Sequence, residues 1–193
     1  MNFESGPRMA SCDNFRIEVE GKSAHGSTPH QGVDAILAAA HIITEIQTVV
    51  SRMNDPLNPL VITVGTINGG QRFNILADKV VMEGTTRTHS PKMRQKTEPL
   101  LRRIIENTAD SMGAKATLTF EYFPAPIIND HEDLVRIARN AATKMYGTDS
   151  LKPFPKMMIS EDFAYYMEKV PGVFGLVGSQ NRDLGITAKN HND

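Results

Sequence analysis

The sequence has no tryptophan, a single cysteine and no excess of charge of either sign among its 193 residues. Cys12 alone cannot form a disulfide within the chain, and such cysteine usage is typical of a reducing compartment. With 21 Lys and Arg against 22 Asp and Glu, the chain lacks the basic excess with which nucleic-acid-binding proteins neutralise phosphates. We therefore expect no nucleic-acid partner.

Long apolar stretches are also missing. No stretch approaches the roughly 20 apolar residues that a helix needs to cross a bilayer. The first residues, MNFESGPRM, lack the basic start and apolar core of a secretion signal. We therefore expect no membrane partner and a cytoplasmic location. The composition, with 40% hydrophobic and 22% charged residues, is typical of a globular protein with one large domain or two small ones.

Apolar periodicity predicts the order of elements over the first two thirds of the chain. Residues 15–20 alternate apolar and polar side chains, which indicates a half-buried strand, and further strands are expected at 60–67, 79–88 and 115–123. A helix is expected after Asp34, with an apolar stripe at Ile36, Ala39, Ala40, Ile43, Ile46 and Val50.

The second predicted helix contains a proline. Ser90 and Pro91 are typical of a helix start. Pro99, however, removes a backbone donor and clashes with the preceding turn, at a cost of about 3 kcal/mol. We therefore expect the firm part of this helix to begin at Pro99 and to end at Gly113.

The order strand, helix, strand, strand, helix, strand is that of the ferredoxin-like β-α-β-β-α-β arrangement. It predicts an α/β (α+β) protein with an antiparallel four-stranded sheet and both helices on one face, over residues 12–125. Residues 126–193 carry a helical stripe at 134–145, a helix start at Ser160 and a strand-like segment at 173–178. They hold too few apolar residues for a core of their own, and we expect a partial α/β segment.

The loop from His25 to His30 is the first candidate for chemistry. Two imidazoles in a loop rich in Gly, Ser and Pro could bind a metal, act as acid or base, or donate a hydrogen bond to an oxyanion. The alternative is that both are ordinary exposed residues, since no carboxylate neighbours them in sequence.

Asn74 and Arg87 are the second candidate. The guanidinium of Arg87 presents a planar fork that suits a carboxylate, and an Asn amide can donate beside it. The pair could hold an anionic substrate group, although an arginine at a strand end can equally be a solvated charge.

Two further candidates are a pair of adjacent carboxylates and a histidine near the chain end. Glu161 and Asp162 follow Ser160, where they could complement a helix dipole or anchor a metal or substrate. His191 lies close to the chain end, and the sequence stops too soon after it to decide its role.

Taken in order, these segments resemble the M20 family of metal-dependent peptidases and amidohydrolases, closest to its N-acyl-amino-acid amidohydrolases and hippurate hydrolases. FRIEVEGKSAHGSTPHQGVDAI resembles the first strand, histidine loop and helix entry of the family's lid, or dimerisation, domain. GTINGGQRFNILADKVVMEGTTRT resembles its glycine-rich strand, Asn-containing connection and Arg-bearing strand. SEDFAYYMEKVPGVFGLVG resembles the return to the catalytic domain.

The resemblance implies a role for each candidate. His25 corresponds to the lid histidine that polarises the scissile carbonyl, commonly in the active site of the partner subunit. Asn74 and Arg87 correspond to groups that hold the substrate carboxylate. His191 corresponds to one ligand of a centre of two divalent metal ions, zinc or manganese. The resemblance also implies a homodimer through the lid at residues 12–125, with residues 126–193 as a C-terminal fragment of the catalytic domain.

The chain departs from the family pattern in two ways. It has no N-terminal segment with the other metal ligands and the general base, and Ala77 stands where the family has proline. We therefore predict a portion of a metal-dependent amidohydrolase that hydrolyses the amide bond of N-acyl amino acids or small peptide-like substrates, inactive as an isolated chain. The alternative is a non-catalytic homodimerisation or binding module.

Overall fold

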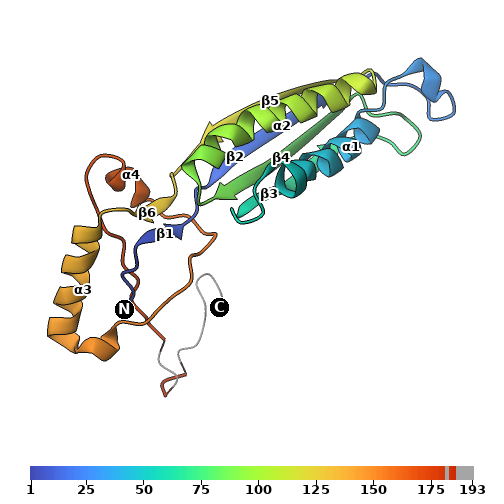
Figure 1. The fold of residues 1–193 in the computed structure, drawn as a ribbon. Helices are drawn as coiled ribbons and strands as arrows, with labels where there is room; N and C mark the ends of the chain where they lie inside the picture. Colours follow the sequence, from blue (N-terminus) through green and yellow to red (C-terminus); the bar gives the residue numbers. More distant parts are fainter. Residues whose placement is uncertain (181–182, 186–193) are drawn as a thin grey trace.

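Four antiparallel strands covered by two long helices make up the larger part of the fold (Figure 1). The computed structural model describes residues 1–180 and 183–185. The sheet has the strand order β3-β4-β2-β5 and all its neighbours are antiparallel. The predicted ferredoxin-like order is confirmed by β2 (Asp13–Glu20), α1 (Ala35–Thr48), β3 (Leu60–Gly69), β4 (Lys79–Thr88), α2 (Pro91–Ser111) and β5 (Lys115–Tyr122). We call this part the four-stranded unit.

Both helices cover the same face of the sheet, so the strands alternate between a core side and an open side. In β2 the side chains of Phe15, Ile17 and Val19 are buried under the helices, while those of Asn14 and Arg16 lie on the open face. Burial of one face fixes the strand register, because a slip by one residue would expose every core side chain.

The buried face of α1 differs from the predicted stripe. Ile36 is 47% exposed and Ala40 is also exposed. Ala39 and Ile46 are buried as predicted, and Ile43 and Val50 pack partly buried against the core. The other core side chains of the helix are Ala35, Ala38 and Ile42, which the prediction omitted. The buried face of the helix therefore lies about one residue position away from the predicted face.

Helix α2 runs unbroken through Pro99, so the prediction that its firm part begins there is wrong. Its start is fixed by the Ser90 side chain, which accepts a hydrogen bond from the Met93 amide at 3.2 Å. Pro99 is exposed to solvent. Burial of one continuous stripe on both sides of the proline outweighs the cost of the proline. The stripe consists of Met93, Thr97, Leu101, Ile105 and Ala109.

The remaining described residues form a smaller second unit around a two-stranded sheet. Strand β1 (Gly6–Met9) pairs antiparallel with β6 (Ile127–Asn129), and it comes from a segment to which the sequence pattern assigns no element. Helices α3 (Glu132–Tyr146) and α4 (Ala164–Met167) belong to this unit. Within residues 1–180 and 183–185, no helix combines the length and apolar character that crossing a bilayer requires.

Two predictions for the second unit are wrong. Helix α4 begins only at Ala164, with Phe163 at the position before it, so Ser160 does not cap a helix. Residues 173–178 form no strand, and Leu176 makes only an isolated bridge with Asn2. Among residues 161–180, all of which the structure describes, only Ala164 is fully buried, while Tyr166 is 66% and Val177 is 73% exposed. Little apolar surface is therefore buried to stabilise longer elements.

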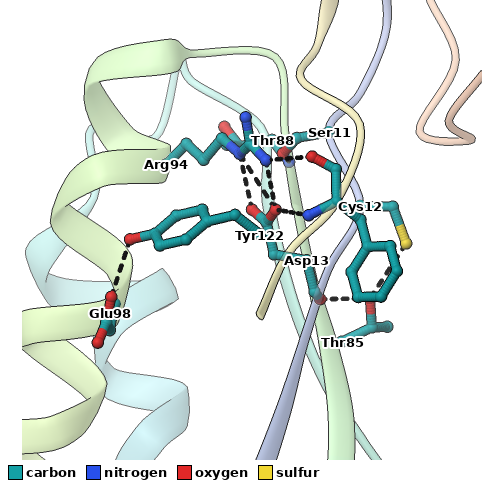
Figure 2. A network of polar contacts seen from close by, with 9 residues as sticks. Ser11, Cys12, Asp13, Thr85, Thr88, Arg94, Glu98 and Tyr122 are labelled. Atoms are coloured by element: carbon teal, nitrogen blue, oxygen red, sulfur yellow. Dashed lines mark hydrogen bonds and ion pairs between the residues drawn. The ribbon is translucent and has the colours of Figure 1, made fainter. Parts of the chain in front are cut away.

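A buried ion pair fixes the end of the four-stranded unit that faces the second unit (Figure 2). The Asp13 side chain is 1% exposed and accepts hydrogen bonds from Nε and Nη2 of Arg94 and from the Phe123 amide. Arg94 also donates to the Phe123 carbonyl and lies over the ring of Tyr122, whose hydroxyl donates to Glu98 at 3.0 Å. The network joins the start of β2, the end of β5 and the first turns of α2.

Replacing Asp13 by alanine should therefore cost much more stability than breaking an exposed ion pair. Arg94, whose side chain is 13% exposed, would keep a buried charge without its carboxylate, and we expect a loss of about 3–5 kcal/mol in urea unfolding. The control Glu83→Gln breaks the exposed Arg16–Glu83 pair and should cost about 0–1 kcal/mol. Equal losses in the two variants would contradict the assigned importance of Asp13.

Candidate functional site

The structure brings two of the predicted residues, His25 and Asn74, to the same end of the sheet. The Gly26 amide donates to the Asn74 carbonyl at 2.8 Å, and the Leu76 amide donates to the Ala24 carbonyl at 2.9 Å. His25 also forms an isolated antiparallel bridge with Ile75. The histidine loop and the 70–78 connection are thus paired at the tip of the four-stranded unit, far from the second unit (Figure 1).

The His25 ring is held from one side and open on the other. Its Nδ1 atom accepts a hydrogen bond from the Ser27 amide at 3.2 Å and lies 2.8 Å from the Ser27 hydroxyl. Because Nδ1 accepts, the neutral ring carries its proton on Nε2. The side chain is exposed, as is that of Asn74. The tip therefore presents an imidazole N–H and a side-chain amide that can donate to the oxygens of a ligand.

Close backbone approach positions this tip. A side chain at Gly32 would place a Cβ 2.6 Å from the Lys22 carbonyl oxygen and 2.8 Å from the Cβ of Ala24. Ala77 is buried, and its carbonyl accepts a hydrogen bond from the Ala35 amide at the start of α1. The connection keeps a defined path with alanine at position 77.

Arg87 lies at the opposite end of β4 from this tip. Measured from Lys79, the first residue of β4, the extended strand carries Arg87 about 27 Å away. Its Nη1 atom lies 3.4 Å from the carbonyl oxygen of Met158, in the second unit. The structure does not bring Asn74 and Arg87 together within one chain, so a single small ligand cannot contact both in the same copy.

Glu161 and Asp162 lie one after the other just before α4. The neighbouring carboxyl group of Asp162, which is hydrogen-bonded to Glu161, and partial burial raise the pKa of Glu161 above its usual value. His191, the predicted metal ligand, lies outside the described residues. Among residues 1–180 and 183–185, no group of three or more His, Cys, Asp or Glu side chains could hold a metal ion. These residues alone therefore do not fit a two-metal centre.

Two features of the structure were not predicted from the sequence. One is a hollow of about 530 Å³ on the open face of the sheet, lined among others by Arg16, Thr63 and Glu83. The other is His89, which is 5% exposed and makes a hydrogen bond of 2.8 Å between its Nε2 atom and the Met157 carbonyl. A lone histidine directly after a strand carries no pattern that would single it out.

Residues 12–112 match the sequence family described as the peptidase dimerisation domain of M20. The chain is 38% identical over 179 residues to an N-acetyl-L-cysteine deacetylase of Bacillus subtilis, which covers 93% of this chain and 42% of that protein. It is 33% identical to an IAA-amino acid hydrolase of Arabidopsis thaliana, over 99% of this chain and 44% of that protein. The chain thus spans less than half the length of these curated relatives.

Solved structures agree with the fold. A putative aminohydrolase from methicillin-resistant Staphylococcus aureus superposes with a TM-score of 0.82 at 29% identity, over 90% of this chain and 44% of that one. A Bacillus subtilis protein described as a dinuclear metal-binding peptidase from the M20 family gives a TM-score of 0.73, also at 29% identity, over 90% and 42% of the two chains.

The pairing at the tip should depend on the absence of a side chain at position 32. In Gly32→Ala the new methyl group must push away the backbone at Lys22, and we expect about tenfold faster hydrogen exchange at the amides of Gly26 and Leu76. The control Gly65→Ala meets only the Glu83 carbonyl, at 3.8 Å, and should leave that exchange unchanged. Equal exchange in the two variants would show that the close approach at Gly32 does not hold the tip.

Proposed function

This chain belongs to the M20 family of peptidases and amidohydrolases, and from that premise we propose that it forms the lid and the C-terminal part of the catalytic domain of a metal-dependent amidohydrolase. The reaction is hydrolysis of the amide bond of an N-acyl amino acid or a small peptide-like substrate. We assign residues 12–125 to the lid and residues 126–193 to the catalytic domain. The observation that carries the proposal is the placement of His25 and Asn74 at the tip and of Arg87 at the base of the same unit.

The separation of these residues supports an active site shared by two subunits. About 27 Å of strand lies between the tip and Arg87, which is too far for one small substrate. Strand β3 runs from the base at Leu60 to the tip at Gly69, so antiparallel pairing of two lids in a two-fold dimer would place the tip of one lid beside the base of the other. His25 and Asn74 of one subunit would then act on a substrate whose carboxylate is held by Arg87 of the other.

The chemistry of each group fits this arrangement. The Nε2–H of His25 would donate to the scissile carbonyl oxygen, a hydrogen bond that strengthens as negative charge develops in the transition state. The guanidinium of Arg87 would bind the carboxylate through two parallel N–H groups. His25 therefore serves the chemical step, while Arg87 serves recognition of the substrate.

Strand β3 supports dimerisation through the lid. It is an edge strand, and its ten residues, LVITVGTING, contain no Lys, Arg, Asp, Glu or Pro. The opposite edge, β5, carries Lys115 and Glu121. Charged residues and prolines are the usual protection of an edge against pairing with another chain, and β3 has neither. We propose that β3 pairs with β3 of a second copy.

The proposal extends to groups that the described residues do not hold. Two divalent ions, zinc or manganese, would be bound by His191 and by ligands from a further segment of the complete enzyme. The similarity to the dinuclear metal-binding peptidase of Bacillus subtilis supports this part of the proposal. When bound, the ions would supply an activated water. We also propose a cytoplasmic location, which the single cysteine supports.

A charge in the middle of β3 should separate the proposed dimer. In Thr63→Lys, two-fold pairing would bring the new ammonium groups of the two copies to the same edge, and we expect a monomer by size-exclusion chromatography with light scattering. The matched control Thr119→Lys places the same change on the open face of β5 and should remain a dimer. A wild-type monomer, or two variants with the same mass, would contradict pairing through β3.

Mixing two impaired variants of a complete enzyme that contains this chain tests the shared site. His25→Ala should lower kcat, and Arg87→Ala should raise KM for substrates with a free carboxylate. In a mixed dimer one active site has both residues intact. At a substrate concentration far below the KM of Arg87→Ala, random re-association should therefore restore about a quarter of the wild-type activity.

No recovery on mixing would show that His25 and Arg87 serve the same subunit. The non-catalytic alternative is tested separately by adding the missing catalytic segment to this chain. Activity that returns on addition is expected from our proposal, while a pure binding module would stay inactive.

A further inference from the structure

Three chain segments meet where the four-stranded unit joins the second unit. Residues 8–11 run from the end of β1 toward β2, residues 87–89 lie at the end of β4, and residues 157–159 belong to the second unit. The Ala10 amide donates to the carbonyls of Met157 and Ile159, and the Met157 amide donates to the Arg8 carbonyl at 2.9 Å. The Ser11 amide donates to the Thr88 carbonyl at 2.8 Å. We call this meeting point the joint.

His89 links the end of β4 to the joint. Its Nε2 atom lies 2.8 Å from the Met157 carbonyl oxygen and must donate to it, because a carbonyl can only accept. The next carbonyl along, that of Met158, is the contact of the Arg87 guanidinium at 3.4 Å. Two side chains from the end of one strand therefore reach successive carbonyls of the same segment.

The other nitrogen of His89 is buried and has no hydrogen-bond partner among the described residues. With Nε2 as the donor, Nδ1 carries no proton in the neutral ring, and an unpaired acceptor costs less than an unpaired charged donor would. Protonation would place an N–H at Nδ1 without an acceptor. The ring is thus held in one tautomer by its surroundings.

We propose that His89 is a positioning residue for Arg87. Its bond to the Met157 carbonyl fixes segment 157–159 against the end of β4, and this holds the guanidinium where the substrate carboxylate arrives. The inference rests on the proposed role of Arg87. The bond from Arg87 to Met158 is long, so the arginine keeps donors for a ligand while its carbonyl contact sets its direction.

Burial lowers the pKa of His89 below its usual value, and the positive charges of Lys156 and Arg8 act in the same direction, while the bond to Met157 opposes them. Arg8 is itself paired with Glu4 at 3.0 Å. A histidine with a lowered pKa stabilises the fold fully above its unfolded pKa of about 6.5, and this stabilisation is lost as the pH falls from there through the folded value. The joint should therefore weaken only under acid conditions.

Two substitutions of His89 distinguish the effect of its hydrogen-bond donor from the effect of its planar ring. His89→Phe keeps a planar side chain without a donor, and His89→Gln keeps an amide donor that does not titrate. We expect His89→Phe to exchange the Ala10 and Met157 amides about tenfold faster than the wild type at about pH 7.5, and His89→Gln to retain most of the protection. Below about pH 6.5, the protection factors should fall in the wild type and stay constant in His89→Gln.

The second measurement uses a complete enzyme that contains this chain. His89→Phe should raise KM about tenfold for a substrate with a free carboxylate, leave kcat within about twofold, and leave KM unchanged for the carboxamide analogue. His89→Gln should restore KM.

The outcomes distinguish the positioning role from the carboxylate site on which it rests. The positioning role would be overturned if the Ala10 and Met157 amides of His89→Phe exchanged at the wild-type rate. It would also be overturned if His89→Phe left KM unchanged while Arg87→Ala raised KM. If Arg87→Ala itself leaves KM unchanged, the proposed carboxylate site is wrong, and the exchange rates alone then show whether His89 holds the joint.

Discussion

The rest of the structure depends on one carboxylate taken out of water. Asp13 lies where the chain enters the four-stranded unit, and its charge is balanced by the Arg94 guanidinium from α2 and by an amide just beyond β5. A buried charge of this kind is tolerated only when its partners are held in good geometry. The pair therefore fixes the entry, the exit and one helix relative to one another (Figure 2). It thereby also fixes the base of the sheet, where β4 ends just after Arg87.

The sequence predicted the fold where one physical requirement dominates, and failed where two compete. Alternation in β2 identifies the strand because a single face is buried. In α1 the periodic rule places Ile36 on the buried face, yet Ala35 and Ala38 pack in the core and Ile36 lies near the turn at Gly70. The local cost of Pro99 predicts a break in α2, but the stripe buried on both sides of it belongs to tertiary packing.

The candidate site was also predicted only in part. Motifs and resemblance selected His25, Asn74 and Arg87 as candidates. The structure shows that the first two are neighbours and that the third lies at the far end of β4. Nothing local marks His89, because its importance comes from a carbonyl nearly seventy residues away. The second unit was least predictable, since β6 finds its partner in the first residues of the chain.

The pairing of the first residue of β2 with the last of β5 has a consequence for the history of such proteins. Because Asp13 lies opposite Tyr122, the chain leaves the four-stranded unit beside the point where it entered. A unit whose two ends are adjacent can be inserted into a surface loop of another domain with little disturbance to either. The tip and the edge strand could therefore move between scaffolds as one cassette, which would carry His25, Asn74 and Arg87 together.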